Sequence, residues 1–211
     1  LGGLASAIAT GLERLDPAHR RSLAFLGALG MAVGVSELSA HPQVLGSIPE
    51  LIRRGLVQPV TDGRLRVLGP IATACLARPE VASAAREAWE HLVERAEEAA
   101  ARVGTDPRAA LDTLESLLDG LDAVIHHAGP VLAARAALAL CPVARRRGPV
   151  TAHRRRIEAA LEHAPPPELA DPLRVEHVAL VCAEGRGSAE QIEGLASNDT
   201  PRSHQVRGIY A

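Results

Sequence analysis

Residues 51–77 are the one stretch of this chain in which the period of the hydrophobic pattern changes. Apolar residues at helical spacing lead into Gly55. Residues 56–57 and 65–67 then predict two short strands, because apolar and polar residues alternate in the second of them. The turn between them, at residues 61–63, ends in Asp-Gly, which supplies the positive φ angles that hairpin turns need.

The helical spacing resumes after the Gly-Pro pair at residues 69–70, so that helix, two-stranded ribbon and helix follow one another. Two amphipathic helices are expected before this stretch, and Asp16 is placed to cap the second of them. A short helix at 35–40 and a longer one at 43–54 then lead into the ribbon. A helical lead-in with this order is the layout of a winged-helix domain, which we expect at residues 1–78.

Beyond residue 78 the hydrophobic pattern keeps the helical period. One long apolar stripe stops at Gly104 and is followed by a Thr-Asp-Pro start signal. Residues 111–125 form the next stripe, which the spacing predicts to be one helix. We therefore expect residues 79–130 to form a helical connector hairpin.

The remaining part, residues 131–211, is expected to form pairs of helices. Helices at 131–147 and 151–164 make the first pair, and helices at 169–184 and 188–195 make the second. Such regularly recurring helical hairpins suggest tetratricopeptide-like repeats stacked into an α-solenoid. The predicted fold class is all-α, with a winged-helix domain and its small β-ribbon followed by this solenoid.

Composition narrows the functions that the chain can have. The formal net charge is −2, which gives no general attraction to nucleic acid or anionic lipid. All 23 basic residues are Arg, so a Schiff-base or phosphate-loop lysine is excluded. Three cysteines, Cys75, Cys141 and Cys182, form no CxxC pair and are expected to be buried and reduced. With no long apolar run and no signal peptide, we expect a soluble, cytoplasmic protein without a membrane partner.

The ordered set of residues 15–29, 51–57 and 64–76, followed by a long Ala-rich helix, resembles a known family. It is similar to the region after the nucleotide-binding domain in bacterial STAND regulators, which include antibiotic-production regulators and LuxR-type and MalT-like activators. The resemblance implies a winged helix that relays to an NTPase domain, and repeats that bind a protein or effector. The chain itself has no GxxxxGK[ST] loop, so the NTPase domain would be a partner within a longer parent chain. Both ends of the sequence suggest such a longer protein.

Four arginines of the winged-helix region are candidate DNA contacts. A winged helix can lay its last core helix in the major groove and place wing arginines on phosphate. The apolar residues of the helix at 43–54 and its Glu50 favour packing against protein instead. A DNA-binding regulator stays the alternative to the relay function. The candidate residues are Arg53, Arg54, Arg64 and Arg66.

Two arginine triplets flank the turn of the first predicted repeat, and they are either a docking site for an acidic partner or nucleic acid, or solvated helix ends. They are Arg145, Arg146, Arg147, Arg154, Arg155 and Arg156. No serine elbow, HExxH pair or other catalytic signature accompanies the nine histidines. We therefore predict no enzyme, no catalytic or metal-binding residue and no cofactor.

Overall fold

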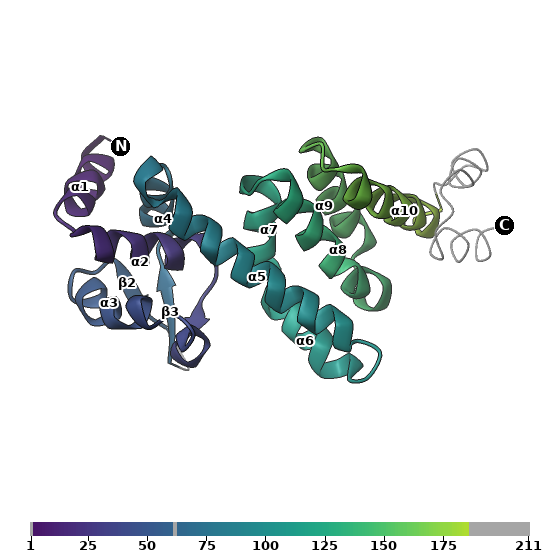
Figure 1. The fold of residues 1–211 in the computed structure, drawn as a ribbon, viewed down its shortest axis with the longest axis horizontal. Helices are drawn as coiled ribbons and strands as arrows, with labels where there is room; N and C mark the ends of the chain where they lie inside the picture. Colours follow the sequence, from purple (N-terminus) through teal and green to yellow (C-terminus); the bar gives the residue numbers. More distant parts are fainter. Residues whose placement is uncertain (1, 61–62, 186–211) are drawn as a thin grey trace. The chain divides into compact units, whose positions relative to one another are not determined.

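The computed structural model describes residues 2–60 and 63–185, and these residues are mostly helical (Figure 1). The described part holds ten α-helices and a three-stranded sheet, so the predicted mainly helical class is confirmed. The chain divides into two compact units, Leu1–Leu92 and Val93–Ala211. Helix α5 (Ala82–Arg102) begins in the first unit and ends in the second. The functional boundaries suggested at residues 78 and 130 stay a prediction, because the units describe compactness alone.

The first unit opens with α1 (Gly2–Glu13) and α2 (Pro17–Ala28). The carboxylate of Asp16 accepts a hydrogen bond from the backbone N–H of His19 at 2.9 Å. Pro17 occupies the first helical position, where its missing N–H costs nothing. The hydrogen bonds from His19 also lower the pKa of Asp16. The predicted cap of α2 is confirmed.

Helix α3 (Pro42–Arg53) ends two residues before the glycine that the sequence pattern marked. Gly55 has a φ of 70°, which side-chain-bearing residues rarely adopt. Its N–H donates to the carbonyl of Ile52 at 2.8 Å, and the N–H of Leu56 donates to the carbonyl of Leu51 at 2.9 Å. These two bonds satisfy the last turn of the helix and direct the chain into the sheet.

The predicted ribbon consists of β2 (Val57–Pro59) and β3 (Arg64–Val67), which pair antiparallel with Val57 opposite Val67. The apolar residues of β3 are buried and Arg66 is exposed, so the predicted alternation is confirmed. One side of this small sheet therefore belongs to the core of the first unit.

A third strand, β1 (Val33–Gly34), pairs with β3 and gives the sheet order β1-β3-β2. The sequence did not predict it, because two residues are too few to show an alternating pattern. The short helix expected at 35–40 is a 3₁₀ helix, η1 (Val35–Leu38). The predicted turn at 61–63 lies mostly outside the described residues, and its last residue, Gly63, has a φ of 68°.

Large aliphatic side chains form the core of the first unit, together with one phenylalanine. Helix α4 (Gly69–Leu76) packs against α2, where a Cβ added to Gly27 would lie 3.2 Å from the Cβ of Ala72. After the 3₁₀ helix η3 (Pro79–Val81), Trp89 on α5 donates its Nε1–H to the carbonyl of Ala28 at 3.1 Å. The largest fully buried residues of this unit are Leu12, Leu23, Phe25, Leu29, Leu38, Leu51 and Leu92.

The second unit continues with α6 (Pro107–Ser116) and α7 (Leu118–His127). The prediction of one helix over 111–125 was wrong, because the chain breaks between these two. The hydroxyl groups of Thr113 and Ser116 donate to backbone carbonyls one turn back, at 2.8 and 2.7 Å. Such side-chain bonds compete with the helical ladder and bend helices.

The last described helices are α8 (Pro130–Arg147), α9 (Val150–Glu162) and α10 (Pro167–Ala183), and each packs against the other two. Two residues join α8 to α9, so this helix pair matches its prediction. The helix expected at 188–195 lies outside the described residues. The buried residues of α8 are mostly alanines: Ala133, Ala134, Ala136, Ala137, Ala139 and Ala144. Among the helices that are described, none is long and apolar enough to cross a membrane.

Candidate functional site

The two arginines at the end of α3 are occupied by one carboxylate. Arg53 donates to both carboxylate oxygens of Glu50, at 2.8 and 2.6 Å, and Arg54 donates to the same group at 2.5 Å. Arg54 also donates to the carbonyl of Arg14 at 3.2 Å. Hydrogen bonds from Arg53 and Arg54 lower the pKa of Glu50 to about 2. This pairing reduces the positive charge that α3 can offer to a phosphate.

The two arginines of β3 differ from each other. Arg64 lies 3.5 Å from the carboxylate of Glu37, which in turn accepts the backbone N–H of Gly34. Arg66 is exposed, and within the described part of the chain nothing pairs with it. Arg66 is therefore the most available cation of the four candidates in the first unit.

The first arginine triplet ties α8 to two other helices. Arg145 pairs with Glu176 of α10, a glutamate that is only 1% exposed. Burial raises the pKa of Glu176, and the Arg145 charge opposes that rise. Arg147 donates to Asp112 and Glu115 of α6, both at 2.7 Å. These are contacts between helices, whereas the sequence suggested solvated helix ends or a docking site.

Arginines of the second triplet, on α9, also pair with acidic residues outside their own helix. Arg156 donates to both carboxylate oxygens of Asp122 on α7, at 2.5 and 2.9 Å, and Arg154 donates to Glu184 at 3.2 Å. Burial, together with the Arg156 charge, lowers the pKa of His153 to about 4, so its ring is neutral at physiological pH. Its Nδ1 can then accept the hydrogen bond from Arg156 at 3.3 Å.

One arginine of each triplet is exposed and makes no ion pair with a described residue. Arg146 and Arg155 have no hydrogen bond or ion pair to any residue in 2–60 or 63–185. A docking site of six positive charges is therefore reduced to two arginines that the described residues leave unpaired, while the other four hold helices of the second unit together.

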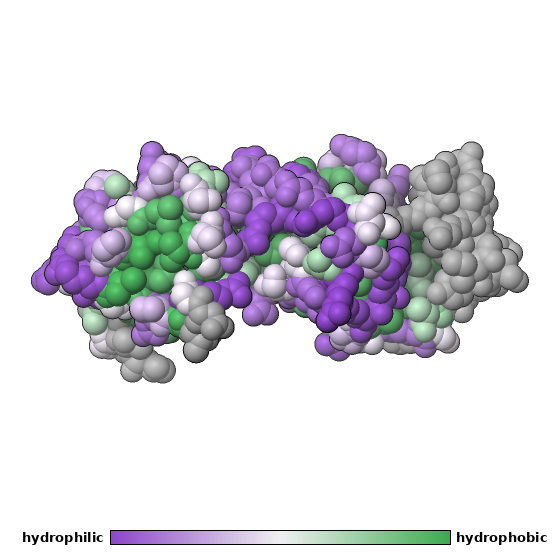
Figure 2. All heavy atoms as spheres, turned by 90° about the horizontal axis from the view of Figure 1, so that it is seen from below, coloured by the Kyte–Doolittle hydropathy of each residue, from purple (hydrophilic) through white to green (hydrophobic). Residues whose placement is uncertain are grey.

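The outward face of α3 carries an apolar stripe beside its buried face. Leu45, Pro49 and Ile52 lie at helical spacing, and each of them keeps exposed surface. Three large apolar residues of this unit, Val35, Val60 and Leu68, are also exposed and add to its apolar surface. Figure 2, seen from the side on which α3 lies in Figure 1, shows apolar surface gathered over the first unit.

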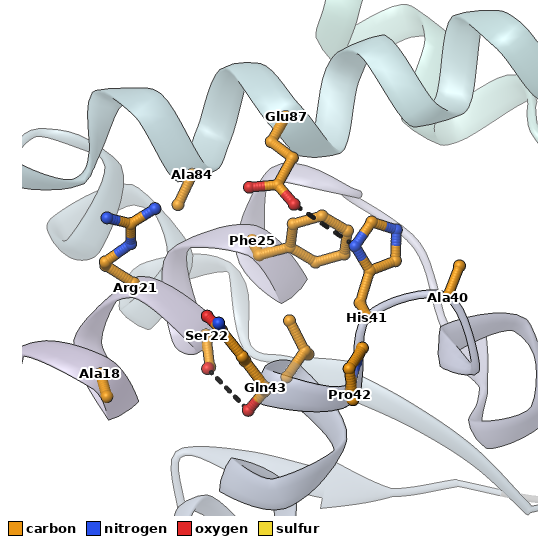
Figure 3. A pocket seen from close by; sticks show the side chains of 11 residues that line it. Ala18, Arg21, Ser22, Phe25, Ala40, His41, Pro42, Gln43, Ala84 and Glu87 are labelled. Carbon is orange, nitrogen blue, oxygen red and sulfur yellow. Dashed lines mark hydrogen bonds and ion pairs between the residues drawn. The ribbon is translucent and has the colours of Figure 1, made fainter.

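A pocket of about 570 Å³ lies in the first unit between α2, the start of α3 and α5 (Figure 3). His41 forms one wall: its ring lies 4.4 Å from that of Phe25, and its Nδ1 lies 3.4 Å from the carboxylate of Glu87. The sequence did not predict this pocket, because its residues come from three separate elements. The lining residues are Ala18, Arg21, Ser22, Phe25, Ala40, His41, Pro42, Gln43, Val44, Ala84 and Glu87.

The three cysteines differ in their burial. Cys75 and Cys141 are buried as predicted, and burial raises the pKa of Cys75 to about 11. Cys182 is only partly buried, so that prediction was wrong for it, because it lies in the last turn of α10. Within residues 2–60 and 63–185, no three His, Cys, Asp or Glu side chains are grouped as a metal ion would require.

In comparisons with known proteins, no family model, no curated protein and no solved structure matches this chain.

Proposed function

We propose that this chain is a non-catalytic regulatory and protein-interaction segment of a STAND-type signal-transduction ATPase or transcriptional regulator. The first unit acts as a winged-helix domain that relays a signal to a nucleotide-binding domain of the parent chain. The helical hairpins of the second unit act as tetratricopeptide-like repeats that bind a protein or effector. The sequence resemblance is the starting point of this proposal, and features of both units support it.

The order of elements supports the winged-helix assignment. Helices α1 and α2 precede α3, the ribbon of β2 and β3, and then α4. A helical lead-in followed by helix, ribbon and helix is the winged-helix layout. In such a domain α3 corresponds to the helix that can meet a partner, so its outward face decides what kind of partner fits.

The apolar stripe of α3 is the observation that carries the proposal. Leu45, Pro49 and Ile52 cannot read base edges by hydrogen bonding, but they can pack against an apolar protein surface. The arginines that would contact phosphate from this helix are already paired with Glu50. Both features favour a protein partner, and the NTPase domain is the partner that the resemblance implies.

The arrangement of α8, α9 and α10 supports the repeat assignment. Each of these helices packs on the other two, and the connections between them are short. Stacked helical hairpins bury a continuous core and expose the remaining faces to a partner. The ion pairs between the helices would fix the shape of that surface.

The relay function is tested with the protein encoded upstream in the same reading frame. We expect that frame to encode a phosphate-binding loop, and we expect its nucleotide-binding domain to bind the present chain when the two are mixed. Leu45→Glu should weaken that binding at least tenfold, because it places a charge in the apolar stripe. Arg155→Glu, in the second unit, is the matched control and should have no effect. An upstream frame without the loop, or equal binding by Leu45→Glu, would exclude the relay function.

DNA binding stays a second candidate, and the exposure of Arg66 is the observation in its favour. Phosphate contacts weaken steeply with salt, so binding should be sought at low ionic strength. If this function holds, a mobility shift of duplex DNA should be lost on Arg64→Ala and Arg66→Ala. Absence of any shift at low salt would exclude it.

A further inference from the structure

The pocket of the first unit is lined by both polar and apolar side chains, and one of them is an arginine that no described residue pairs with. Figure 3 shows Arg21 and Glu87 on the α2 and α5 sides of the same space, with Phe25 behind them and Gln43 opposite. Ala18 and Ala84 add small apolar side chains to the lining. A volume of about 570 Å³ falls within the range typical of small-molecule sites.

The charged groups of the pocket are not equivalent. Glu87 already faces a partner, because His41 Nδ1 lies 3.4 Å from its carboxylate. Arg21 is exposed, and the described residues give it neither a hydrogen bond nor an ion pair. The pocket therefore offers a guanidinium that no described residue pairs with, although Glu87 lies in the same lining.

Of the uncharged polar groups, some are bonded within the unit and one is available to a ligand. The hydroxyl of Ser22 is buried and lies 2.9 Å from that of Ser47, and Ser47 donates to the carbonyl of Gln43 at 3.0 Å. These groups satisfy one another within the unit. The carboxamide of Gln43 belongs to an exposed residue of the lining and can donate to a ligand beside Arg21.

We propose that this pocket binds a small organic carboxylate, with its anionic group on Arg21 and its apolar body against Phe25 and Ala84. A guanidinium pairs with a carboxylate through two parallel hydrogen bonds, and Gln43 supplies a further donor. A singly charged carboxylate fits better than a phosphate, because the repulsion from Glu87 grows with the negative charge of the ligand. The ligand would touch three helices of the unit, and this binding function is separate from the relay and repeat functions proposed above.

Benzoate, its neutral isostere benzamide and inorganic phosphate are suitable probes. Each is titrated into the full chain at low salt, and binding is followed by the amide signals of Ala18, Gln43 and Ala84 in ¹H–¹⁵N spectra. Benzoate should give saturable shifts of these signals. It should also raise the melting temperature, because a ligand that binds only the folded chain stabilises it.

Two exposed arginines provide a matched pair of variants. Arg21→Gln should weaken benzoate binding at least tenfold, and Arg155→Gln, in the second unit, should leave it unchanged. Melting curves of both variants check that each remains folded. The proposal is overturned if benzoate does not saturate these signals, if benzamide binds as tightly, if phosphate binds more tightly, or if Arg21→Gln binds like the parent.

Discussion

The two units of this protein hold their helices together by different means. The first unit uses large side chains, a short sheet and the hydrogen bond from Trp89 to Ala28. The second unit has an alanine-lined helix at its centre, and charged pairs join α8 and α9 to their neighbours. Small residues let helix backbones approach closely, but each of them buries little apolar area. The ion pairs of the second unit therefore fix the register of helices whose apolar contacts are small.

The largest effects should come from removing one buried leucine in each unit. Leu51 on α3 and Leu121 on α7 are both completely buried, so Leu→Ala should cost about 2–5 kcal/mol at either site. Trp89 is the only tryptophan and lies in the first unit, so its fluorescence reports on that unit in urea unfolding. Circular dichroism follows the helices of both units. If the units unfold separately, Leu121→Ala should lower the urea midpoint seen by circular dichroism and leave the midpoint seen by Trp89 fluorescence unchanged. Equal shifts of both midpoints would show that the two units unfold together.

Overfilling the alanine core tests how closely α8 is packed. Ala137→Leu adds three carbons at a buried position and should destabilise the chain by about 1–3 kcal/mol. The control is Val131→Leu on the same helix, because Val131 is 45% exposed. Urea midpoints of the two variants give the comparison, and equal midpoints would show that the second unit has room at its centre.

Removing Arg145 should lower the free energy of unfolding, because Glu176 would then be buried without its charged partner. Arg145→Ala leaves Glu176 without its charged partner, and because the Arg145 head group is half exposed we expect a loss of about 1–2 kcal/mol at neutral pH. The folded pKa of Glu176 lies above its ordinary value, so the folded chain holds this proton more tightly than the unfolded chain. Its contribution to stability is therefore most favourable below the ordinary pKa, and is lost as the pH rises through the folded pKa.

The pH dependence of this variant separates charge from packing. Without Arg145, the loss of stability should be larger at pH 8 than at pH 5, since the carboxylate is charged at the higher pH. Urea unfolding at both pH values measures it. Arg145→Ala combined with Glu176→Gln should recover most of the loss, and a loss independent of pH would assign the effect to packing alone.

Local signals predicted most of the helices, because caps and stops act over a few neighbouring residues. Asp16 caps α2 and Gly55 follows the end of α3, as the sequence predicted. Leu65 and Val67 are buried, as their alternation with polar residues indicated. The break between α6 and α7 was missed because the apolar stripe runs through it without interruption. The pairing partners of the arginine triplets were also missed. Those partners lie some 30 residues away in sequence, and no local pattern reports such contacts.

The two capping aspartates should contribute equally in both units. Asp16 caps α2 and Asp106 caps α6 with a bond to the N–H of Ala109 at 3.3 Å. Replacing either by Ala should cost about 1 kcal/mol, because one helix N-terminus loses its side-chain acceptor. Replacement by Asn is the control and should cost far less, since Asn caps nearly as well. Thermal unfolding followed by circular dichroism measures both, and unequal losses would mean that the cap energy depends on the unit.

The smallest expected effect comes from two neighbouring arginines on α9. Arg156 donates to both oxygens of Asp122 on α7 and is largely buried, whereas Arg155 is exposed and has no ion pair within the described ranges. Arg156→Gln should cost about 0.5–1 kcal/mol, at the upper end of what surface ion pairs contribute. Arg155→Gln should change stability by less than about 0.5 kcal/mol, as surface substitutions usually do. Urea unfolding at low and high salt distinguishes the causes. The Arg156 effect should shrink only modestly at high salt, since a partly buried pair is weakly screened, and its disappearance would show that the pair behaves like an exposed one.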